Sequence, residues 1–196
     1  MIKLKELLMN EMPMDNTILD TEIVNALETK LKVKISGDYT GVDKIPLEGG
    51  YVILKGFLND IKDCWAAIVN PSGDNDIPEL CFGASLKLSN FARNIPSYQV
   101  MLACKYKSYP KYAASKLYIA LVKKYNIALF SDERVTNEGK GIWYELLTRP
   151  NIEKEGVRIF VYDKKTRQEI TNYGNIDDLF GADNKFENIL VGMRTI

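Results

Sequence analysis

The stretch that decides the fold opens with Tyr98-Gln-Val-Met-Leu-Ala-Cys-Lys-Tyr106 and continues to Asp163. The opening segment is short, β-prone and contains neither glycine nor proline. Ser108-Tyr-Pro110 follows it, and a proline cannot donate a hydrogen bond to a strand ladder. The pattern therefore predicts a strand that ends in a turn.

An amphipathic helix is predicted next, from Tyr112 to Tyr125. Its apolar residues recur three and four positions apart, while Lys116, Lys123 and Lys124 fall on the other side. The apolar positions are Ala113, Ala114, Leu117, Tyr118, Leu121, Val122 and Tyr125. This spacing is typical of a helix rather than of a strand.

A second strand, a second helix and a third strand complete the stretch. The apolar run Ile127-Ala-Leu-Phe130 is too brief for a helix and is predicted to be a buried strand. A helix is expected over Asn137–Thr148, with Thr136 or Asn137 as its N-cap. The alternation of Val157-Arg-Ile-Phe-Val-Tyr162 predicts the third strand. Since one helix bridges the first two strands, we expect these two to be parallel neighbours.

The chain before this stretch is expected to contain helices and then an antiparallel meander. Met1–Met14 and the segment that ends at Leu31 have helical spacing, whereas Ser36–Gly50 is rich in Gly, Asp and Pro and is predicted to be a loop. A turn at Asn59-Asp60 should join the first two strands as a hairpin. The three strand candidates are Tyr51–Leu58, Ile61–Asn70 and Leu80–Leu88.

Composition limits the classes of function. The 196 residues are 46% hydrophobic, which is enough for one well-buried core, so a single domain over residues 1–196 is expected. Lys and Arg number 26, as do Asp and Glu, so no net field attracts nucleic acid. No apolar run approaches the roughly 20 residues that span a bilayer. We therefore predict neither a nucleic-acid nor a membrane partner, and a cytoplasmic location.

Cysteine and histidine usage narrows the chemistry further. Cys64, Cys81 and Cys104 are an odd number of widely spaced cysteines in apolar surroundings, and we predict buried thiols outside any disulfide. Histidine is absent, which excludes histidine-based catalytic triads and removes the commonest metal ligand. No metal site is predicted.

Three segments resemble the acyl-CoA-binding half of the GCN5-related N-acetyltransferases (the GNAT superfamily), and more closely the degenerate members encoded by tailed bacteriophages. They are Tyr109-Pro-Lys-Tyr-Ala-Ala-Ser-Lys-Leu-Tyr118, Leu129-Phe-Ser-Asp132 and Thr136-Asn-Glu-Gly-Lys-Gly-Ile-Trp-Tyr-Glu-Leu146. The resemblance implies an α+β, GNAT-like fold, in which an antiparallel meander precedes a β-α-β-α-β unit within one mixed sheet. It implies an acyl-CoA-binding half at about 98–163 and a C-terminal extension at 164–196.

The resemblance also implies acetyl-CoA as the cofactor. In the family, a turn between the central strand and its helix presents backbone N–H groups to the pyrophosphate of the cofactor. The family pattern is Arg or Gln, two residues, Gly, one residue, Gly or Ala, and Leu three positions on. Ala114 and Leu117 match this pattern, whereas Tyr109 stands at the Arg or Gln position and Tyr112 at the first glycine. The implied binding residues are Cys104, Lys105, Tyr106, Lys107, Lys111, Tyr112, Ala113 and Ala114.

Two alternatives remain for Tyr112. Its ring either closes the turn by packing on the helix start, or points outward and leaves the backbone amides in an open cleft. In the first case glycine at this position should lower stability, and in the second it should cost little.

The resemblance implies a general acid and a general base. The family often has Asn, two residues, Ala, three residues and Tyr, and the Tyr protonates the departing CoA thiolate. Asn137 and Tyr144 have this separation, but a register shifted by one instead puts Trp143 at the aromatic position. Asp132 and Glu133, at the end of a strand, are the candidates for taking a proton from the amine.

Two functions are carried forward. In the first, the protein transfers an acetyl group from acetyl-CoA to an amine on a small molecule or a protein, within the cytoplasm of a phage host. In the second, it is a non-catalytic GNAT-like scaffold that serves as a virion component or binds a host protein.

Overall fold

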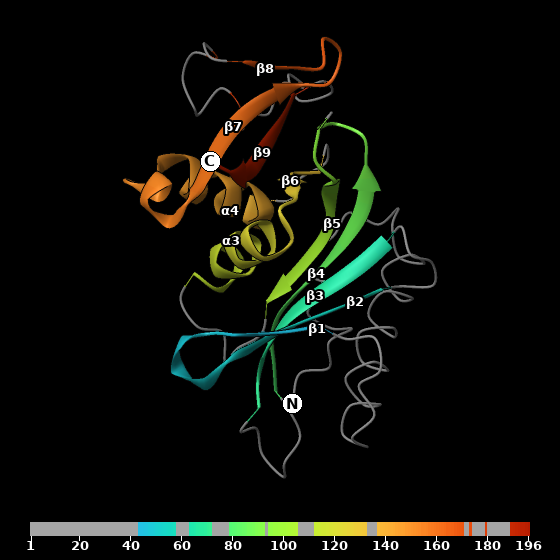
Figure 1. Ribbon diagram of the computed structural model, residues 1–196. Helices are drawn as coiled ribbons and strands as arrows, with labels where there is room; N and C mark the ends of the chain where they lie inside the picture. The colour runs from blue at the N-terminus through green and yellow to red at the C-terminus, as the bar shows by residue number, and fades with distance from the viewer. Residues whose placement is uncertain are drawn as a thin grey trace. The chain divides into compact units, whose positions relative to one another are not determined.

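A computed structural model of the protein describes residues 43–57, 63–71, 79–92, 94–105, 112–132, 137–170, 173, 179 and 189–196. Over these ranges the protein has an α+β fold, in which nine strands form one open sheet that is mixed and mostly antiparallel (Figure 1). Two α-helices belong to the same ranges, α3 (Ala113–Tyr125) and α4 (Asn137–Thr148). The α+β class is therefore as predicted.

The strands follow the order β1-β2-β3-β4-β5-β6-β9-β7-β8 across the sheet. Their bounds are β1 (Asp43–Pro46), β2 (Val52–Phe57), β3 (Asp63–Asn70), β4 (Glu79–Ser89), β5 (Ser97–Lys105), β6 (Ala128–Phe130), β7 (Val157–Asp163), β8 (Gln168–Ile170) and β9 (Ile189–Thr195). Two short 3₁₀-helices are also described, η2 (Glu48–Gly50) and η4 (Ile152–Glu155).

The described chain falls into two compact units. The first draws its residues from Met1–Leu86 and Leu102–Ala113, and the second from Lys87–Met101 and Ala114–Ile196. The predicted helices before Leu31 lie outside the described residues.

The first unit contains the predicted hairpin. β2 and β3 pair antiparallel, from Val52 opposite Val69 to Phe57 opposite Cys64. The loop prediction for Ser36–Gly50 is wrong in part, because Asp43–Pro46 forms β1 and pairs with β2. β1 is short, charged and ends in proline, which suits an edge strand but hides the strand pattern in the sequence.

The core of the first unit is built around a tryptophan. Trp65 is 1% exposed and packs with Leu54, Ala67 and Val69. Its ring lies over Gly56, its cross-strand partner, so closely that a Cβ there would stand 2.8 Å from the indole carbons. Any larger residue at Gly56 would displace this ring.

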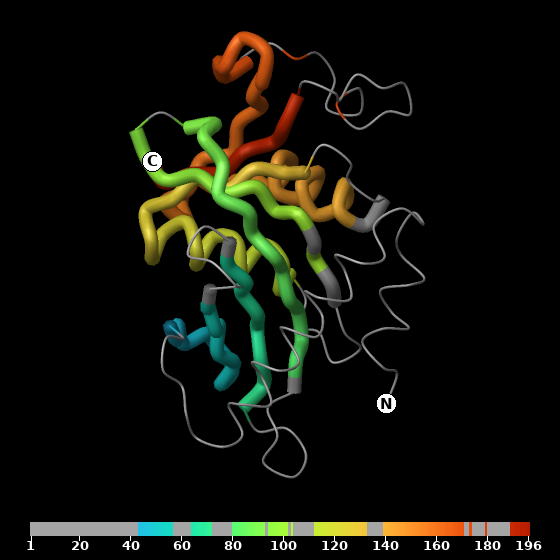
Figure 2. The backbone as a smooth tube through the Cα atoms, turned by 90° about the vertical axis from the view of Figure 1, so that its right-hand side faces the viewer, coloured from blue at the N-terminus to red at the C-terminus, as the bar shows by residue number. Residues whose placement is uncertain are grey.

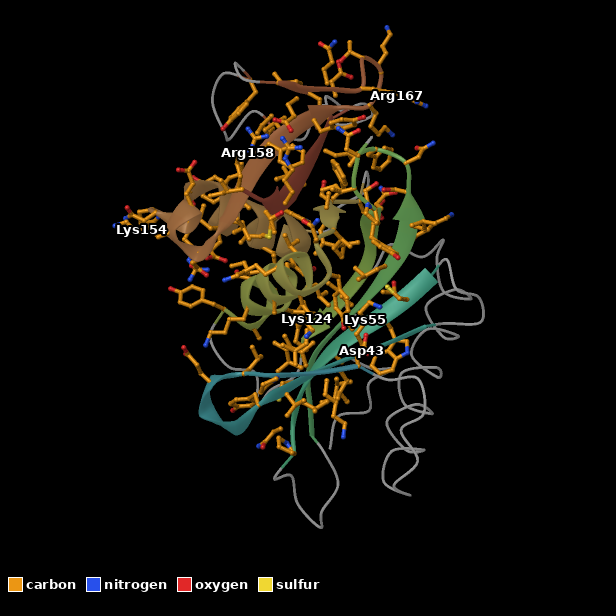
Figure 3. The ribbon with its side chains drawn as sticks, viewed as in Figure 1. Asp43, Lys55, Lys124, Lys154, Arg158 and Arg167 are labelled. Atoms are coloured by element: carbon orange, nitrogen blue, oxygen red, sulfur yellow. The ribbon has the colours of Figure 1, made fainter. Side chains whose placement is uncertain are left out.

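The first unit also contains a pair of opposite charges and two buried cysteines. Lys55 is only 8% exposed and lies opposite Asp43 in the β1–β2 pairing, so the two charges complement each other across the strands (Figure 3). Cys64 and Cys81 are buried and form no disulfide, as predicted. The side chain of Cys104 lies outside the described part of the chain.

The central prediction is confirmed in the second unit. β5 and β6 are parallel neighbours, with Ser97 opposite Ala128 and Gln99 opposite Phe130. α3 is the connection between them, and its predicted apolar positions are buried, except Tyr125, which is partly exposed. The strand at 157–162 and the helix at 137–148 are also where the sequence predicts them.

The last strand occupies a place that the sequence did not indicate. β9 lies between β6 and β7 and is antiparallel to both, as the red segment beside the yellow β6 shows in Figure 2. From its residues alone, the segment from Phe186 to Met193 is compatible with either a last strand or a short helix. Part of the predicted C-terminal extension therefore lies inside the sheet.

Candidate functional site

Asp132, one of the two predicted bases, lies just beyond β6. The Gln99 side chain donates from Nε2 to the backbone oxygen of Ser131 at 3.3 Å and to Oδ1 of Asp132 at 3.2 Å. The Ser131 hydroxyl accepts a hydrogen bond from the backbone N–H of Val191 at 3.0 Å, which ties this strand end to β9. The Asp132 carboxylate is thus held in place and only partly buried, as a group that exchanges a proton with a ligand must be. Glu133 lies outside the described residues.

Tyr112 directly precedes α3 and has an unusual backbone. Its φ angle is 64°, in the left-handed region that glycine adopts without cost and other residues rarely adopt. The residue is 43% exposed, so its ring is not buried on the helix start. Of the two alternatives for Tyr112, the outward ring agrees with this exposure. Ala113 and Ala114, the first residues of α3, are buried.

The first turn of α3 contains no acidic residue of its own, but the Glu145 carboxylate of α4 accepts a hydrogen bond from Ser115 in that turn. The other predicted cofactor-binding residues lie outside the described part of the structure, wholly or in their side chains. Cys104 and Lys105 end β5, but their side chains are outside the described part of the structure. Tyr106, Lys107 and Lys111 fall in the range 106–111, which is also outside it.

The two aromatic candidates of α4 have different environments. Trp143 is 2% exposed and stacks on Tyr118 of α3, with the ring centroids 5.5 Å apart and the planes at 24°. Tyr144 is 41% exposed. Trp143 therefore joins α3 to α4, whereas Tyr144 presents a hydroxyl-bearing side chain at the surface.

A polar network that the sequence analysis missed joins the same two helices. The buried Ser115 hydroxyl, in the first turn of α3, donates a short hydrogen bond to the Glu145 carboxylate of α4. Arg149 lies 3.9 Å from that carboxylate and 2.9 Å from the Glu155 carboxylate of η4. The network fixes the start of α3 relative to α4. Because Ser115 and Glu145 are thirty positions apart, no local pattern reveals the pair.

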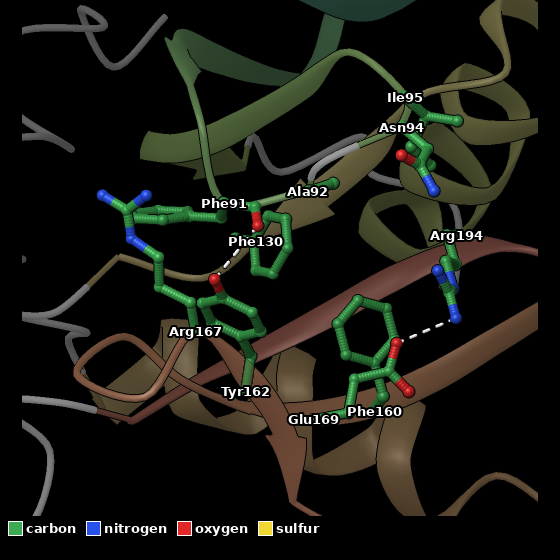
Figure 4. Close-up of a pocket in the computed structure, with 10 residues that line it drawn as sticks. All are labelled: Phe91, Ala92, Asn94, Ile95, Phe130, Phe160, Tyr162, Arg167, Glu169 and Arg194. Carbon is green, nitrogen blue, oxygen red and sulfur yellow. Dashed lines mark hydrogen bonds and ion pairs between the residues drawn. The ribbon is translucent and has the colours of Figure 1, made fainter.

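A pocket of about 190 Å³ lies on the side of β6, β9 and β7 that carries alternate aromatic residues (Figure 4). We call this side the aromatic face; it consists of Phe130, Phe160 and Tyr162, with Phe91 packed on it. Phe130 contacts the other three rings and Phe91 also contacts Tyr162, with centroid separations of 5.2 to 5.9 Å. The complete lining is Phe91, Ala92, Asn94, Ile95, Phe130, Phe160, Tyr162, Arg167, Glu169 and Arg194.

Charged side chains form the rim of this pocket. The Glu169 carboxylate pairs with both Arg194, at 2.9 Å, and Arg158. Both guanidinium groups also lie over the Phe160 ring, 5.4 and 5.7 Å from its centroid. Arg167 comes from the turn between β7 and β8 (Figure 3).

Asp163 anchors the turn that carries Arg167. Its Oδ1 accepts hydrogen bonds from the backbone N–H groups of Lys165 at 2.8 Å and Thr166 at 3.3 Å. Desolvation alone would raise the pKa of the Asp163 carboxyl, but these hydrogen bonds outweigh it and hold the pKa below its ordinary value. The carboxylate form therefore orders the turn at neutral pH.

Comparison with known proteins adds no relative: neither a family model nor a curated protein matches the chain. Within the described ranges, no group of three or more Cys, Asp or Glu side chains is arranged to hold a metal ion. Nor is either described helix long and apolar enough to cross a membrane.

Proposed function

We propose that the protein binds acetyl-CoA in the manner of the GNAT superfamily, with the pyrophosphate at the turn before α3, and transfers the acetyl group to an amine. The observation that carries this proposal is the backbone of Tyr112. Its φ of 64° is a glycine-like conformation at the residue that corresponds to the first glycine of the family pattern.

A left-handed conformation costs a residue with a side chain roughly 1 to 2 kcal/mol, so it persists where the surrounding structure imposes it. This conformational cost is compatible with a phosphate site, because a left-handed residue can turn successive backbone N–H groups toward one point. The Tyr112 side chain is 43% exposed and so is not packed over the start of α3, which supports the proposal.

The parallel pair β5 and β6 supports the same proposal. The resemblance implies this arrangement, in which one helix connects the central strand to a parallel neighbour. The acyl-CoA-binding half of the family contains the same unit. The pairing spans only three residue pairs, from Ser97–Ala128 to Gln99–Phe130, and Asp132 follows directly at its end. A carboxylate is thus available beside the strand pair.

The proposed reaction needs no covalent intermediate on the protein. The amine nitrogen attacks the thioester carbonyl, the C–N bond forms as the C–S bond breaks, and CoA leaves as a thiolate. Backbone N–H groups of β5 stabilise the developing oxyanion. Asp132 or Glu133 takes the amine proton, and Tyr144, which is exposed, gives a proton to the thiolate.

The second candidate is a non-catalytic GNAT-like scaffold, as a virion component or a host-binding protein. Two observations favour it: a tyrosine replaces the glycine of the turn, and Trp143, the alternative aromatic residue of the motif, is buried in the helix pair. A scaffold should bind no acetyl-CoA, so ligand binding separates the two candidates.

Replacing Tyr112 with glycine and, separately, with alanine tests the turn. Both variants lose the ring, but only alanine keeps the conformational cost of a positive φ, so Tyr112→Gly should be more stable than Tyr112→Ala by about 1 kcal/mol. Urea unfolding measures the difference. An alanine variant as stable as the glycine variant, or more stable, would contradict the left-handed backbone, because alanine is otherwise the better residue.

The same three proteins test the ligand. Acetyl-CoA should raise the melting temperature of the wild type and of Tyr112→Gly, because a ligand that binds only the folded state stabilises it. Desulfo-CoA, which carries the phosphates of the cofactor but no reactive thioester, is the control for hydrolysis of acetyl-CoA during the melt. If neither ligand shifts any of the melting curves, the scaffold is the correct candidate.

A further inference from the structure

We propose that the pocket on the aromatic face is a binding site for a small aromatic anion, with Arg167 as the counter-charge. The site is independent of the proposed acyl-CoA turn, because none of its lining residues belongs to that turn or to the residues assigned to acetyl transfer.

The floor of the pocket is apolar. Phe130, Phe160 and Tyr162 are each at most 8% exposed and present ring edges and faces to one another at angles of 66 to 83°. The Tyr162 hydroxyl, which would otherwise make the floor polar, donates to the backbone oxygen of Phe91 at 3.0 Å (Figure 4). Such a surface favours a flat ring, which packs on aromatic neighbours in tilted or offset geometry.

The volume fits one ring. An engineered apolar cavity of roughly 150 Å³ binds benzene. The pocket here measures about 190 Å³, which leaves room for a ring and a small anionic substituent. A nucleotide or another large ligand would extend outside the pocket.

The charged side chains at the rim of the pocket determine which ligand charge it favours. The lining contains two cations, Arg167 and Arg194, and one anion, Glu169. Arg194 is already paired with Glu169, as is Arg158 outside the lining. Among the described residues, Arg167 has no ion pair or hydrogen bond of its own side chain. Within the described residues, no ion pair therefore competes with a ligand carboxylate or phosphate for its guanidinium.

The backbone of Arg167 gives a second reason to assign it a role. Its φ is 55°, again in the left-handed region, although a glycine would meet no penalty in this turn. The turn is ordered by the Asp163 carboxylate, which accepts the backbone N–H groups of Lys165 and Thr166. Arginine is thus held at a position where glycine would be the easier residue, and its side chain lines the pocket.

Four single-ring probes test the ligand class by calorimetry or by ligand-observed NMR with the wild-type protein. Benzoate and phenyl phosphate carry the anion, benzamide is the neutral analogue and benzylamine is the cationic one. We expect at least one of the two anions to bind, and benzamide and benzylamine to bind about tenfold more weakly or not at all. The stronger of the two anions identifies the group, carboxylate or phosphate, that the natural ligand carries.

Two variants of the same turn test the role of Arg167. Arg167→Gly removes the guanidinium and relaxes the backbone, so the protein should fold while its affinity for the anion falls about tenfold or more. Lys165→Ala removes an equal charge from the same turn but from a residue outside the pocket lining, and it should change affinity less than twofold.

A third variant tests the location. Ala92→Leu adds three carbon atoms within the lining and should abolish binding of every probe, whichever group holds the anion.

Three results would overturn the proposal: benzamide binding as tightly as the anions, equal affinities for wild type and Arg167→Gly, or no binding of either anion to the wild type at millimolar concentration.

Discussion

Replacing Trp143 with alanine is expected to lower the free energy of unfolding by about 3 to 5 kcal/mol. Trp143 is 2% exposed and stacks on Tyr118, so the substitution leaves a large cavity between α3 and α4. Denaturant unfolding followed by circular dichroism measures the loss. Such a loss would assign Trp143 to the core and leave Tyr144 as the aromatic candidate of the motif.

The neighbouring residue is the matched control. Tyr144 is 41% exposed, and Tyr144→Ala should change stability by less than about 1 kcal/mol. Under the proposed function the same substitution slows acetyl transfer, and Tyr144→Phe does so without removing the ring. Equal losses of stability at 143 and 144 would contradict the described orientation of α4.

Replacing Gly192 with alanine is expected to destabilise the protein by about 1 to 3 kcal/mol. A Cβ at this position of β9 would stand 2.6 Å from the Phe160 ring and 3.0 Å from the Phe130 ring, both of which are fixed in the aromatic cluster. The rings must shift, and the pocket that they line should change shape with them. Thermal unfolding reports the loss of stability, and binding of benzoate or phenyl phosphate reports the pocket.

Gly141 provides the control for this experiment. It lies within α4 with open space around its Cα, so Gly141→Ala should stabilise the protein by about 0.5 to 1 kcal/mol. The Phe160→Leu background provides a second control, because the cost of Gly192→Ala should shrink when the facing ring is absent. An unchanged cost in that background would show that the clash with Phe160 is not its cause.

The β-α-β unit could be predicted because its information is local. The apolar spacing of α3 and the short apolar run at 127–130 each determine one element, and a single helix between two strands favours parallel pairing. The position of β9 could not be predicted in this way. The residues of Ile189–Thr195 pair with residues 26 to 64 positions earlier, and no local pattern in this segment identifies those partners.

The two proposed sites differ in the same respect. The turn before α3 is contiguous, so the sequence indicated Tyr112 as the decisive residue, although only the exposure of its side chain in the structure separates the outward ring from the packed one. The aromatic pocket combines residues from β6, β7, β8, β9 and the connection after β4. Arg167 lies in the basic turn Lys164-Lys-Thr-Arg167 and has no other local feature, so its proposed role depends on pocket residues that are distant in the sequence.

The central claim, that acetyl-CoA binds at the turn before α3, is tested most directly by calorimetric titration of acetyl-CoA into the wild type and two double variants. Lys107→Glu with Lys111→Glu reverses the charge beside the proposed pyrophosphate site, and should weaken binding at least about tenfold. Lys123→Glu with Lys124→Glu reverses the same charge in the exposed last turn of α3 and should leave affinity within about twofold. Absence of binding to the wild type at millimolar acetyl-CoA, or equal weakening by both double variants, would contradict the account.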